Sequence, residues 1–217
     1  MRSPVDSTEF STPALDSRAA GVAILAAGRG SRMGRSKPLL PWGDGLLLGA
    51  WIARFREAGF GPVAVVCGDD LDAIREAVGE ADDVRWIANP DVDGSGPRES
   101  LLLALDALPA DLPAWFTPVD VPVVAASVLH RVAAGYRSAD PTPLAALPTH
   151  AGRDGHPVLA GPDLIRRLYE GERGDRIDEL FSWATRRLLR IPVEDPSVLG
   201  NMNRPEDYVR FAAATKA

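Results

Sequence analysis

A run of six apolar residues, Val22 to Ala27, leads directly into a glycine-rich loop, and it limits the possible folds more than any other stretch. The run has no polar face, so it predicts a strand covered on both sides, as in the centre of a parallel sheet. Three more apolar runs follow, and each of the four leads to a segment with helical periodicity. The strands are expected at 22–27, 62–67, 84–88 and 114–119, and the helices at 46–58, 69–78, 99–108 and 124–136.

This fourfold alternation predicts an α/β fold with three layers, in which helices cover both faces of a mostly parallel central sheet. The second half of the chain is expected to be smaller and less regular, with short strands among its helices. Strands are expected at 144–147, 156–160 and 187–193, the last as a half-exposed edge strand, and helices at 162–170, 177–185 and 206–214. We expect one domain over residues 21–217, preceded by a disordered tail at 1–20 that is rich in Ser, Thr and Pro.

The composition disfavours several classes of function. The 217 residues, 46% of them hydrophobic, suffice for one sizeable core, and the net charge of -6 disfavours nucleic acid as a partner. No apolar run approaches the roughly 20 residues that cross a bilayer, and the N-terminal tail lacks the apolar segment of a signal peptide. The single cysteine, Cys67, excludes an internal disulfide. We therefore expect a cytoplasmic protein with no membrane partner.

The loop that follows the first strand is strongly positive. Between Gly28 and Lys37 it carries three glycines and four basic side chains, and the chain has no acid between Asp16 and Asp44. Because glycines let backbone N–H groups approach phosphate oxygens, this loop predicts an anion site. Lys37 is one of only two lysines among 24 basic residues, which favours a compact point charge that can contact several phosphate oxygens.

Two common phosphate-binding motifs do not fit this loop. A Walker A loop needs Ser or Thr after its lysine, and Pro38 stands there. A dinucleotide fingerprint needs Gly-x-Gly-x-x-Gly, but Gly30 and Gly34 are spaced one residue too widely. The loop therefore indicates another kind of anion site.

Three segments that follow strand ends carry candidate functional residues. They are the loop Gly28 to Lys37, the loop Asn89 to Pro97, and Asp120. Because ligands of open α/β sheets bind at the carboxyl ends of the strands, we expect these segments to converge on one rim. Asp120 is the best candidate for a metal ligand there, and a turn or helix-capping role is the alternative.

The full pattern of the first loop, Leu25-Ala-Ala-Gly-Arg-Gly-Ser-Arg-Met-Gly-x-x-Lys37, strongly resembles the signature of nucleotidyltransferases with a GT-A-like Rossmannoid fold. The later motifs look like those of the molybdenum cofactor nucleotidyltransferases: Lys37-Pro-Leu-Leu-Pro-Trp42, Pro118-Val-Asp-Val-Pro122 and Gly155-His-Pro-Val158. Within that group, Leu-Ala-Ala-Gly28 and Gly-His-Pro resemble the cytidylyltransferase (MocA-like) branch. The guanylyltransferase (MobA-like) branch typically reads Leu-Ala-Gly-Gly at the first position.

The resemblance implies a Mg²⁺-dependent transfer of CMP from CTP to a phosphorylated small-molecule acceptor, with molybdopterin or the molybdenum cofactor as the acceptor and pyrophosphate as the product. It implies that residues 21–136 form the nucleotide-binding half and residues 137–217 the acceptor-binding half. A molybdoenzyme is the protein partner that such a product implies.

The same resemblance implies roles for individual residues. It implies catalytic roles for Arg32, Lys37 and Asp120, metal binding by Asp120 and Asn203, and acceptor-side roles for His156 and Asn201. Leu25 and Ala26 are expected to line the base pocket, across from Asn89-Pro90. The nucleotide is expected to contact Leu25, Ala26, Ala27, Gly28, Gly30, Ser31, Arg32, Met33, Gly34, Lys37, Asn89, Pro90 and Gly96.

Two stretches depart from the cytidylyltransferase pattern. Asn201-Met-Asn203 stands where that branch usually shows Asp-x-Asp; Asn203 can ligate a metal through its carbonyl, or it can merely cap the last helix. Gly96-Pro97 is similar to the guanylyltransferase branch. The alternatives are therefore a GTP-using enzyme, an enzyme acting on a sugar or alcohol phosphate, and a cofactor-binding carrier without catalytic activity.

Overall fold

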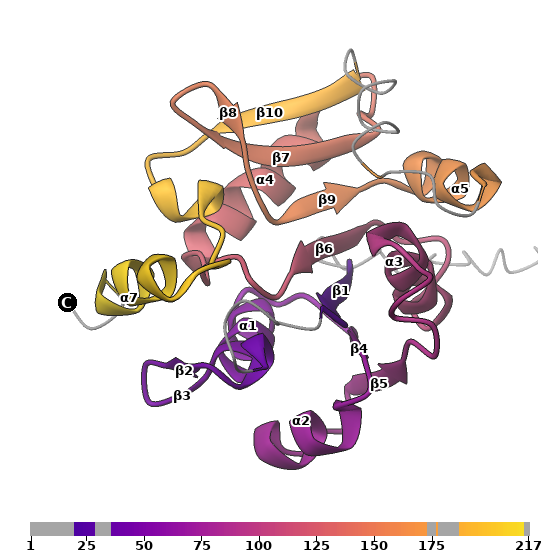
Figure 1. Ribbon diagram of the computed structural model, residues 1–217. Coiled ribbons are helices and arrows are strands. Elements are labelled where there is room, and N and C mark those ends of the chain that lie inside the picture. Colours follow the sequence, from indigo (N-terminus) through magenta and orange to yellow (C-terminus); the bar gives the residue numbers. More distant parts are fainter. Residues whose placement is uncertain (1–19, 29–35, 173–176, 178–186, 215–217) are drawn as a thin grey trace, which may run out of the picture.

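The computed structural model describes residues 20–28, 36–172, 177 and 187–214, and the structural statements below concern these residues. Most of their strands form one eight-stranded sheet, drawn from top to bottom in Figure 1. The order across the sheet is β10 (Leu188–Pro192), β7 (Ala145–His150), β9 (Val158–Ala160), β6 (Ala114–Pro118), β1 (Gly21–Ala26), β4 (Val63–Cys67) and β5 (Val84–Ala88), and β8 (Arg153–Asp154) pairs with β7.

The sheet is mostly parallel. Strands β6, β1, β4 and β5 form one parallel block, and β10 and β7 form a parallel pair. Strand β9 pairs antiparallel with both β6 and β7, so it joins the two blocks. The α/β fold with a mostly parallel central sheet is thereby confirmed, and the half-exposed edge strand expected at 187–193 is β10.

Helices cover both faces of the sheet, as the alternation predicts (Figure 1). One face packs against α1 (Leu47–Glu57), α2 (Leu71–Val78), α4 (Ala126–Ser138) and α7 (Pro205–Ala214). The other face packs against α3 (Pro97–Asp106) and α5 (Pro162–Glu170). Alternate residues of β1 enter the two cores: Val22 and Ile24 lie in the first, and Ala23 lies in the second. Both faces of β1 are buried, which explains why its sequence is apolar without interruption.

Prolines and glycines set the helix boundaries. Pro97 and Pro162 begin α3 and α5, where a residue without an N–H group costs no helical hydrogen bond. Gly59 lies just beyond the end of α1 with φ of +78° and donates its N–H to the carbonyl of Arg56. This left-handed conformation favours glycine, so the sequence ends α1 at this point.

Five short elements were not expected from the sequence pattern. They are the 3-10 helix η1 (Lys37–Leu39), the hairpin strands β2 (Pro41–Trp42) and β3 (Gly45–Leu46), the strand β8, and the 3-10 helix η3 (Pro196–Leu199). The helix expected at 177–185 and the tail expected at 1–20 lie outside the described residues, apart from Ile177 and Ala20. Within the described ranges, every helix is too short or too polar to cross a membrane.

Candidate active site

A cavity of about 340 Å³ opens at the carboxyl ends of the parallel strands. Three strand ends and the segment at Lys37 supply its walls, as expected for ligand sites of open α/β sheets. Its lining residues are Leu25, Ala27, Gly28, Lys37, Asn89, Val92, Ser95, Gly96, Pro97, Ser100, Pro118, Val119 and Asp120. The convergence expected for the first loop, the Asn89 loop and Asp120 is therefore found.

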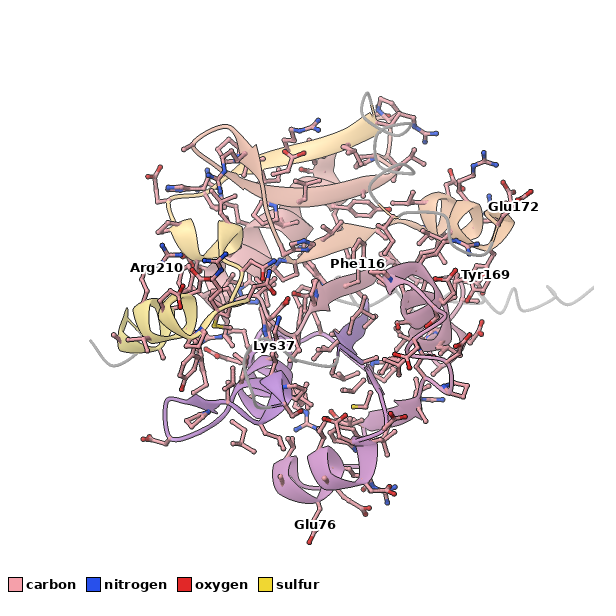
Figure 2. All side chains as sticks on the ribbon, in the orientation of Figure 1. Lys37, Glu76, Phe116, Tyr169, Glu172 and Arg210 are labelled. Atoms are coloured by element: carbon pink, nitrogen blue, oxygen red, sulfur yellow. The ribbon has the colours of Figure 1, made fainter. Side chains whose placement is uncertain are left out.

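Lys37 is the ionic centre of this site, and Figure 2 shows it near the middle of the molecule. Its Nζ atom lies 2.7 Å from Oδ2 of Asp120 and 2.7 Å from Oδ1 of Asn203. The side chains of Lys37 and Asp120 are only 14% and 19% exposed, so the ion pair is partly shielded from solvent. One ammonium group thus binds the two side chains that the family resemblance implies as metal ligands.

Local hydrogen bonds hold Lys37 at the first turn of η1. The hydroxyl of Ser36 donates to Asp70 at the start of α2, at 2.7 Å. Backbone N–H groups of Leu39 and Leu40 donate to the carbonyls of Ser36 and Lys37 and close the turn. Pro38 is buried. The segment that carries the lysine is therefore fixed on both sides.

Asp120 is fixed through the backbone on either side of it. The N–H of Val119 donates to the carbonyl of Leu25 at 2.9 Å, which extends the pairing of β1 and β6 past the strand end. The indole N–H of the buried Trp51 donates to the carbonyl of Val121 at 3.0 Å. The carboxylate therefore stands on a rigid turn that the sheet and α1 both hold.

The segment before α7 reaches Asp120 by a different route. Met202 is fully buried, and its N–H donates to the carbonyl of Asp120 at 2.8 Å. Gly200 packs so closely that an added Cβ would lie 2.5 Å from the ring of Pro122 and 2.8 Å from Phe211. These contacts place Asn203 beside Lys37. The position favours a role for Asn203 in the site over simple capping of α7. Asn201 is exposed, and no described contact brings it to the cavity.

His156 lies in a buried turn near the same carboxylate. Its N–H donates to the carbonyl of Val198 at 2.9 Å, and a Cβ on Gly155 would lie 2.6 Å from that same oxygen. The Nδ1 atom of His156 is buried and has no hydrogen-bond partner among the described residues. Burial lowers the pKa of His156, and the negative charge of Asp120 opposes the shift. The ring is therefore expected to be neutral at neutral pH, with one nitrogen unused by the protein.

Asn89 organises the loop between β5 and α3. Its amide nitrogen donates to the hydroxyls of Ser95 at 2.9 Å and Ser100 at 3.0 Å, and its amide oxygen accepts from the N–H of Asp91 at 3.0 Å. Because the side chain is 4% exposed, these bonds satisfy most of what it can donate or accept. Asn89 therefore shapes the cavity wall formed by its own loop. Ser95 was not predicted as a functional residue, and its place in a glycine-bearing loop was its only signal in the sequence.

The structure brings together most of the expected site residues that it describes. Leu25, Ala27, Gly28, Lys37, Asn89, Gly96 and Asp120 line the cavity. The expectation that the side chain of Ala26 lines it is wrong, because Ala26 is 2% exposed and packs in the core on the other face of β1. Pro90 is exposed and does not line the cavity either. The expected site residues outside the described part of the chain are Gly30, Ser31, Arg32, Met33 and Gly34.

A mostly parallel sheet whose carboxyl edge carries a cavity lined by a glycine, a lysine and a carboxylate places the chain among α/β proteins with a ligand site at the strand ends. The chain belongs to the family of MobA-like NTP transferase domains, whose sequence pattern matches residues 22–191. The expected family is thereby confirmed, and the chain is a nucleotidyltransferase.

Individual relatives agree with this family. The chain is 31% identical over 201 residues to a probable molybdenum cofactor guanylyltransferase of Opitutus terrae, and the match covers 87% of this chain and 92% of that protein. It is 22% identical over 186 residues to the molybdenum cofactor cytidylyltransferase of Escherichia coli, with 86% and 92% covered. A nucleotidyl transferase from Methanothermobacter thermautotrophicus is similar in structure, with a TM-score of 0.75, 28% identity, and 91% and 97% covered.

Replacement of Gly200 by alanine is expected to lower the free energy of unfolding, although Gly200 does not line the cavity. The added methyl group overlaps Pro122 and Phe211, whereas the φ of -69° at Gly200 is one that alanine adopts freely. Overpacking of this kind costs about 1–3 kcal/mol, which urea unfolding followed by circular dichroism would measure. Gly45→Ala is the matched control, because a Cβ there has no neighbour within 4 Å. Equal stability of the two variants would show that the packing at Gly200 is not tight.

The pKa of His156 is expected to lie below its ordinary value of 6.5. Since the folded state disfavours the protonated ring, the unfolded state binds more protons, and stability falls as the pH drops through 6.5 towards the folded pKa. An NMR titration of the imidazole in the metal-free protein measures this pKa directly. In Asp120→Asn the pKa of His156 should fall further, because the charge that opposes the shift is gone. A value at or above 6.5 in the wild type would contradict this account.

Proposed function

We propose that this chain transfers CMP from CTP to a phosphorylated acceptor, with molybdopterin or its molybdenum complex as the acceptor, and releases pyrophosphate. The observation that carries the proposal is the meeting of Lys37, Asp120 and Asn203 at the rim of a cavity that Gly28 borders. The names of the relatives in Opitutus terrae and Escherichia coli support the acceptor.

A divalent cation, with Mg²⁺ as the proposed ion, fits the oxygens at the rim. The carboxylate of Asp120 and the amide oxygen of Asn203 both lie 2.7 Å from the same ammonium nitrogen, so they already converge on one positive charge. Hard oxygen ligands, including one or two carboxylates with water and phosphate, are what Mg²⁺ prefers. Among the described residues no group of three or more His, Cys, Asp or Glu side chains could hold a metal. The bound ion would supply positive charge against the triphosphate.

The residues of the chain supply position and charge. An oxygen of the acceptor phosphate attacks the α-phosphorus, and the bond from that phosphorus to pyrophosphate breaks as the new phosphoanhydride bond forms. Lys37 and Arg32 neutralise the charge on the α-phosphate and on the leaving pyrophosphate, and backbone N–H groups near Gly28 hold the outer phosphates. Most of the rate enhancement would then come from alignment and electrostatics, because the protein forms no covalent bond itself.

The choice of CTP rests on the wall formed by the end of β1. Ala27 lines the cavity, and its methyl group occupies space that the Gly-Gly motif of the guanylyltransferase branch leaves open. Less space at this wall favours the smaller pyrimidine.

The second candidate is GTP, which the 31% identity to the Opitutus protein and the Gly96-Pro97 pair favour. A sugar or alcohol phosphate as acceptor is a further alternative, as is a carrier that binds the cofactor without turnover.

Pyrophosphate release should occur with CTP and depend on Lys37 and Asp120. The protein is incubated with Mg²⁺, molybdopterin and each of the four ribonucleoside triphosphates in turn, and pyrophosphate is quantified. Removal of one preorganised charge from such a site typically costs ~100-fold or more in rate, so Lys37→Ala and Asp120→Asn should be nearly inactive. Gly45→Ala, away from the cavity, should retain wild-type activity.

The same panel separates the alternatives. Release with GTP alone would establish the second candidate and reject the pyrimidine assignment. Release only with a sugar phosphate or alcohol phosphate in place of molybdopterin would reject the acceptor. Tight molybdopterin binding without release from any triphosphate would indicate the carrier. If Ala27 selects by size, Ala27→Gly should gain GTP-dependent release relative to the wild type.

Lys37→Met is expected to bind a divalent cation more tightly than the wild type when no nucleotide is present. In the wild type the ammonium group occupies the two oxygens that would bind the metal, so a cation must displace it. Removal of that competing charge should lower the dissociation constant of Mn²⁺ by about tenfold, measured by electron paramagnetic resonance. Asp120→Asn should instead weaken Mn²⁺ binding. Unchanged affinity in Lys37→Met would show that the ammonium does not compete with the metal.

A further inference from the structure

Arg98 is a buried arginine next to the part of the cavity wall that Gly96, Pro97 and Ser100 form. It is the second residue of α3, only 3% exposed, and it crosses to the C-terminal end of α5. Its guanidinium group donates to the carbonyl of Leu168 from Nε at 3.1 Å and from Nη2 at 2.6 Å. It also donates to the carbonyls of Gly171 at 2.6 Å and Glu172 at 3.0 Å. Helices α3 and α5 lie next to each other in Figure 1.

These bonds make Arg98 a cap for α5. The last carbonyls of a helix lack partners within it and carry the negative end of the helix dipole, so a cation there is favourable. A buried charge is tolerated only when its hydrogen bonds are made, and here three carbonyls satisfy the guanidinium. The carboxylate of Glu99, 3.6 Å from Nη1, adds a nearby opposite charge. The N-terminus of α3 is therefore firmly attached to α5.

The residues around Arg98 in the chain form the cavity. Gly96, Pro97 and Ser100 line it. Glu99 accepts the N–H of Gly96 at 2.8 Å, and Ser100 accepts from Asn89 at 3.0 Å. The loop from Asn89 to Pro97 is thus held at one end by Asn89 and at the other by the turn that Arg98 ties to α5.

We propose that Arg98 is a positioning residue that sets the place of the 96–100 wall against α5 and thereby the affinity for the nucleoside triphosphate. The proposal rests on the proposed function, because it assumes that this wall contacts the nucleotide. Lys37 lies in η1 and Asp120 follows β6, so loss of Arg98 leaves the reacting groups in place. An interaction that binds substrate and transition state equally changes KM and leaves kcat unchanged, and a wall contact is of this kind.

A second contact between the same helices provides the control. The hydroxyl of Tyr169, labelled in Figure 2, donates to Oδ1 of Asp106 at 2.7 Å and joins α5 to the last residue of α3. Neither residue lines the cavity at the strand ends. Tyr169→Phe therefore loosens the packing of α3 on α5 at the end away from the nucleotide, whereas Arg98→Met loosens it beside the nucleotide.

The experiment compares the wild type, Arg98→Met, Arg98→Lys and Tyr169→Phe by steady-state kinetics, by calorimetric titration with CTP and Mg²⁺, and by thermal unfolding. In Arg98→Met we expect KM and the dissociation constant for CTP to rise about tenfold and kcat to stay within about twofold. Arg98→Lys keeps the charge but not the planar fork, so about a threefold rise is expected. Tyr169→Phe should lower the melting temperature without changing KM.

An unchanged KM and dissociation constant in folded Arg98→Met would overturn the proposal, and so would an equal rise in Tyr169→Phe. If Arg98→Met does not fold, Arg98→Lys decides, and an unchanged KM and dissociation constant there reject the proposal. Failure of the proposed function looks different, because the wild type would then release no pyrophosphate from CTP. GTP then replaces CTP in the same comparison if the panel shows GTP-dependent release.

Discussion

One ammonium group joins the three parts of the chain on which the site depends. Lys37 contacts Asp120 and Asn203, which are 83 and 166 residues away in the sequence, at 2.7 Å each. Without the lysine, a partly shielded carboxylate and an amide oxygen would face each other with no donor between them, which is unfavourable. The protein therefore carries its own positive charge at the point where the proposed metal would bind. Under the proposed function, a metal bound by Asp120 and Asn203 would displace the ammonium group of Lys37, which would then contact phosphate oxygens.

The sheet explains why two of these three groups meet. Strands β1 and β6 are parallel neighbours in which Leu25 is aligned with Pro118, so the loops that leave them start side by side. Asn203 follows no strand, and it reaches the site through the bond from Met202 to Asp120 and the close packing of Gly200 on Pro122. The pairing of β1 with β6 positions Asp120, the bond from Ser36 to Asp70 and the turn of η1 hold Lys37, and a backbone hydrogen bond together with tight packing at Gly200 positions Asn203. The third position is therefore the one most sensitive to changes of volume in the core.

Hydrophobic patterning was sufficient to predict most of the fold, and strand ends were sufficient to place Lys37 and Asp120 together. The alternation of side chains along a strand explains why Ala26 does not line the cavity as predicted. Adjacent residues of β1 face opposite sides of the sheet, so Leu25 faces the cavity and Ala26 faces the core on the other side. Other features leave no local signal. Arg98 binds main-chain carbonyls about 70 residues away, and its sequence neighbourhood resembles any polar helix start. For Asn203 the sequence left metal binding and helix capping both open, and the contact of its amide oxygen with Lys37 favours the site. The sequence alone could not predict hydrogen bonds between distant segments in which one partner is a backbone carbonyl.

The conflicting branch signals have a physical explanation under the proposed function. Ala27 directly follows β1, and Gly96-Pro97 stands at the start of α3, so the two motifs form different parts of one cavity wall. The base of the nucleotide must fit between these two segments, so the space between them limits its size. Asn89 fixes the shape of the loop, while Arg98 fixes α3 relative to α5. Base selection then depends on residues that hold the wall as well as on those that touch the base. A motif taken from one branch can therefore coexist with a motif from the other, because the buried contacts behind them determine the distance across the cavity.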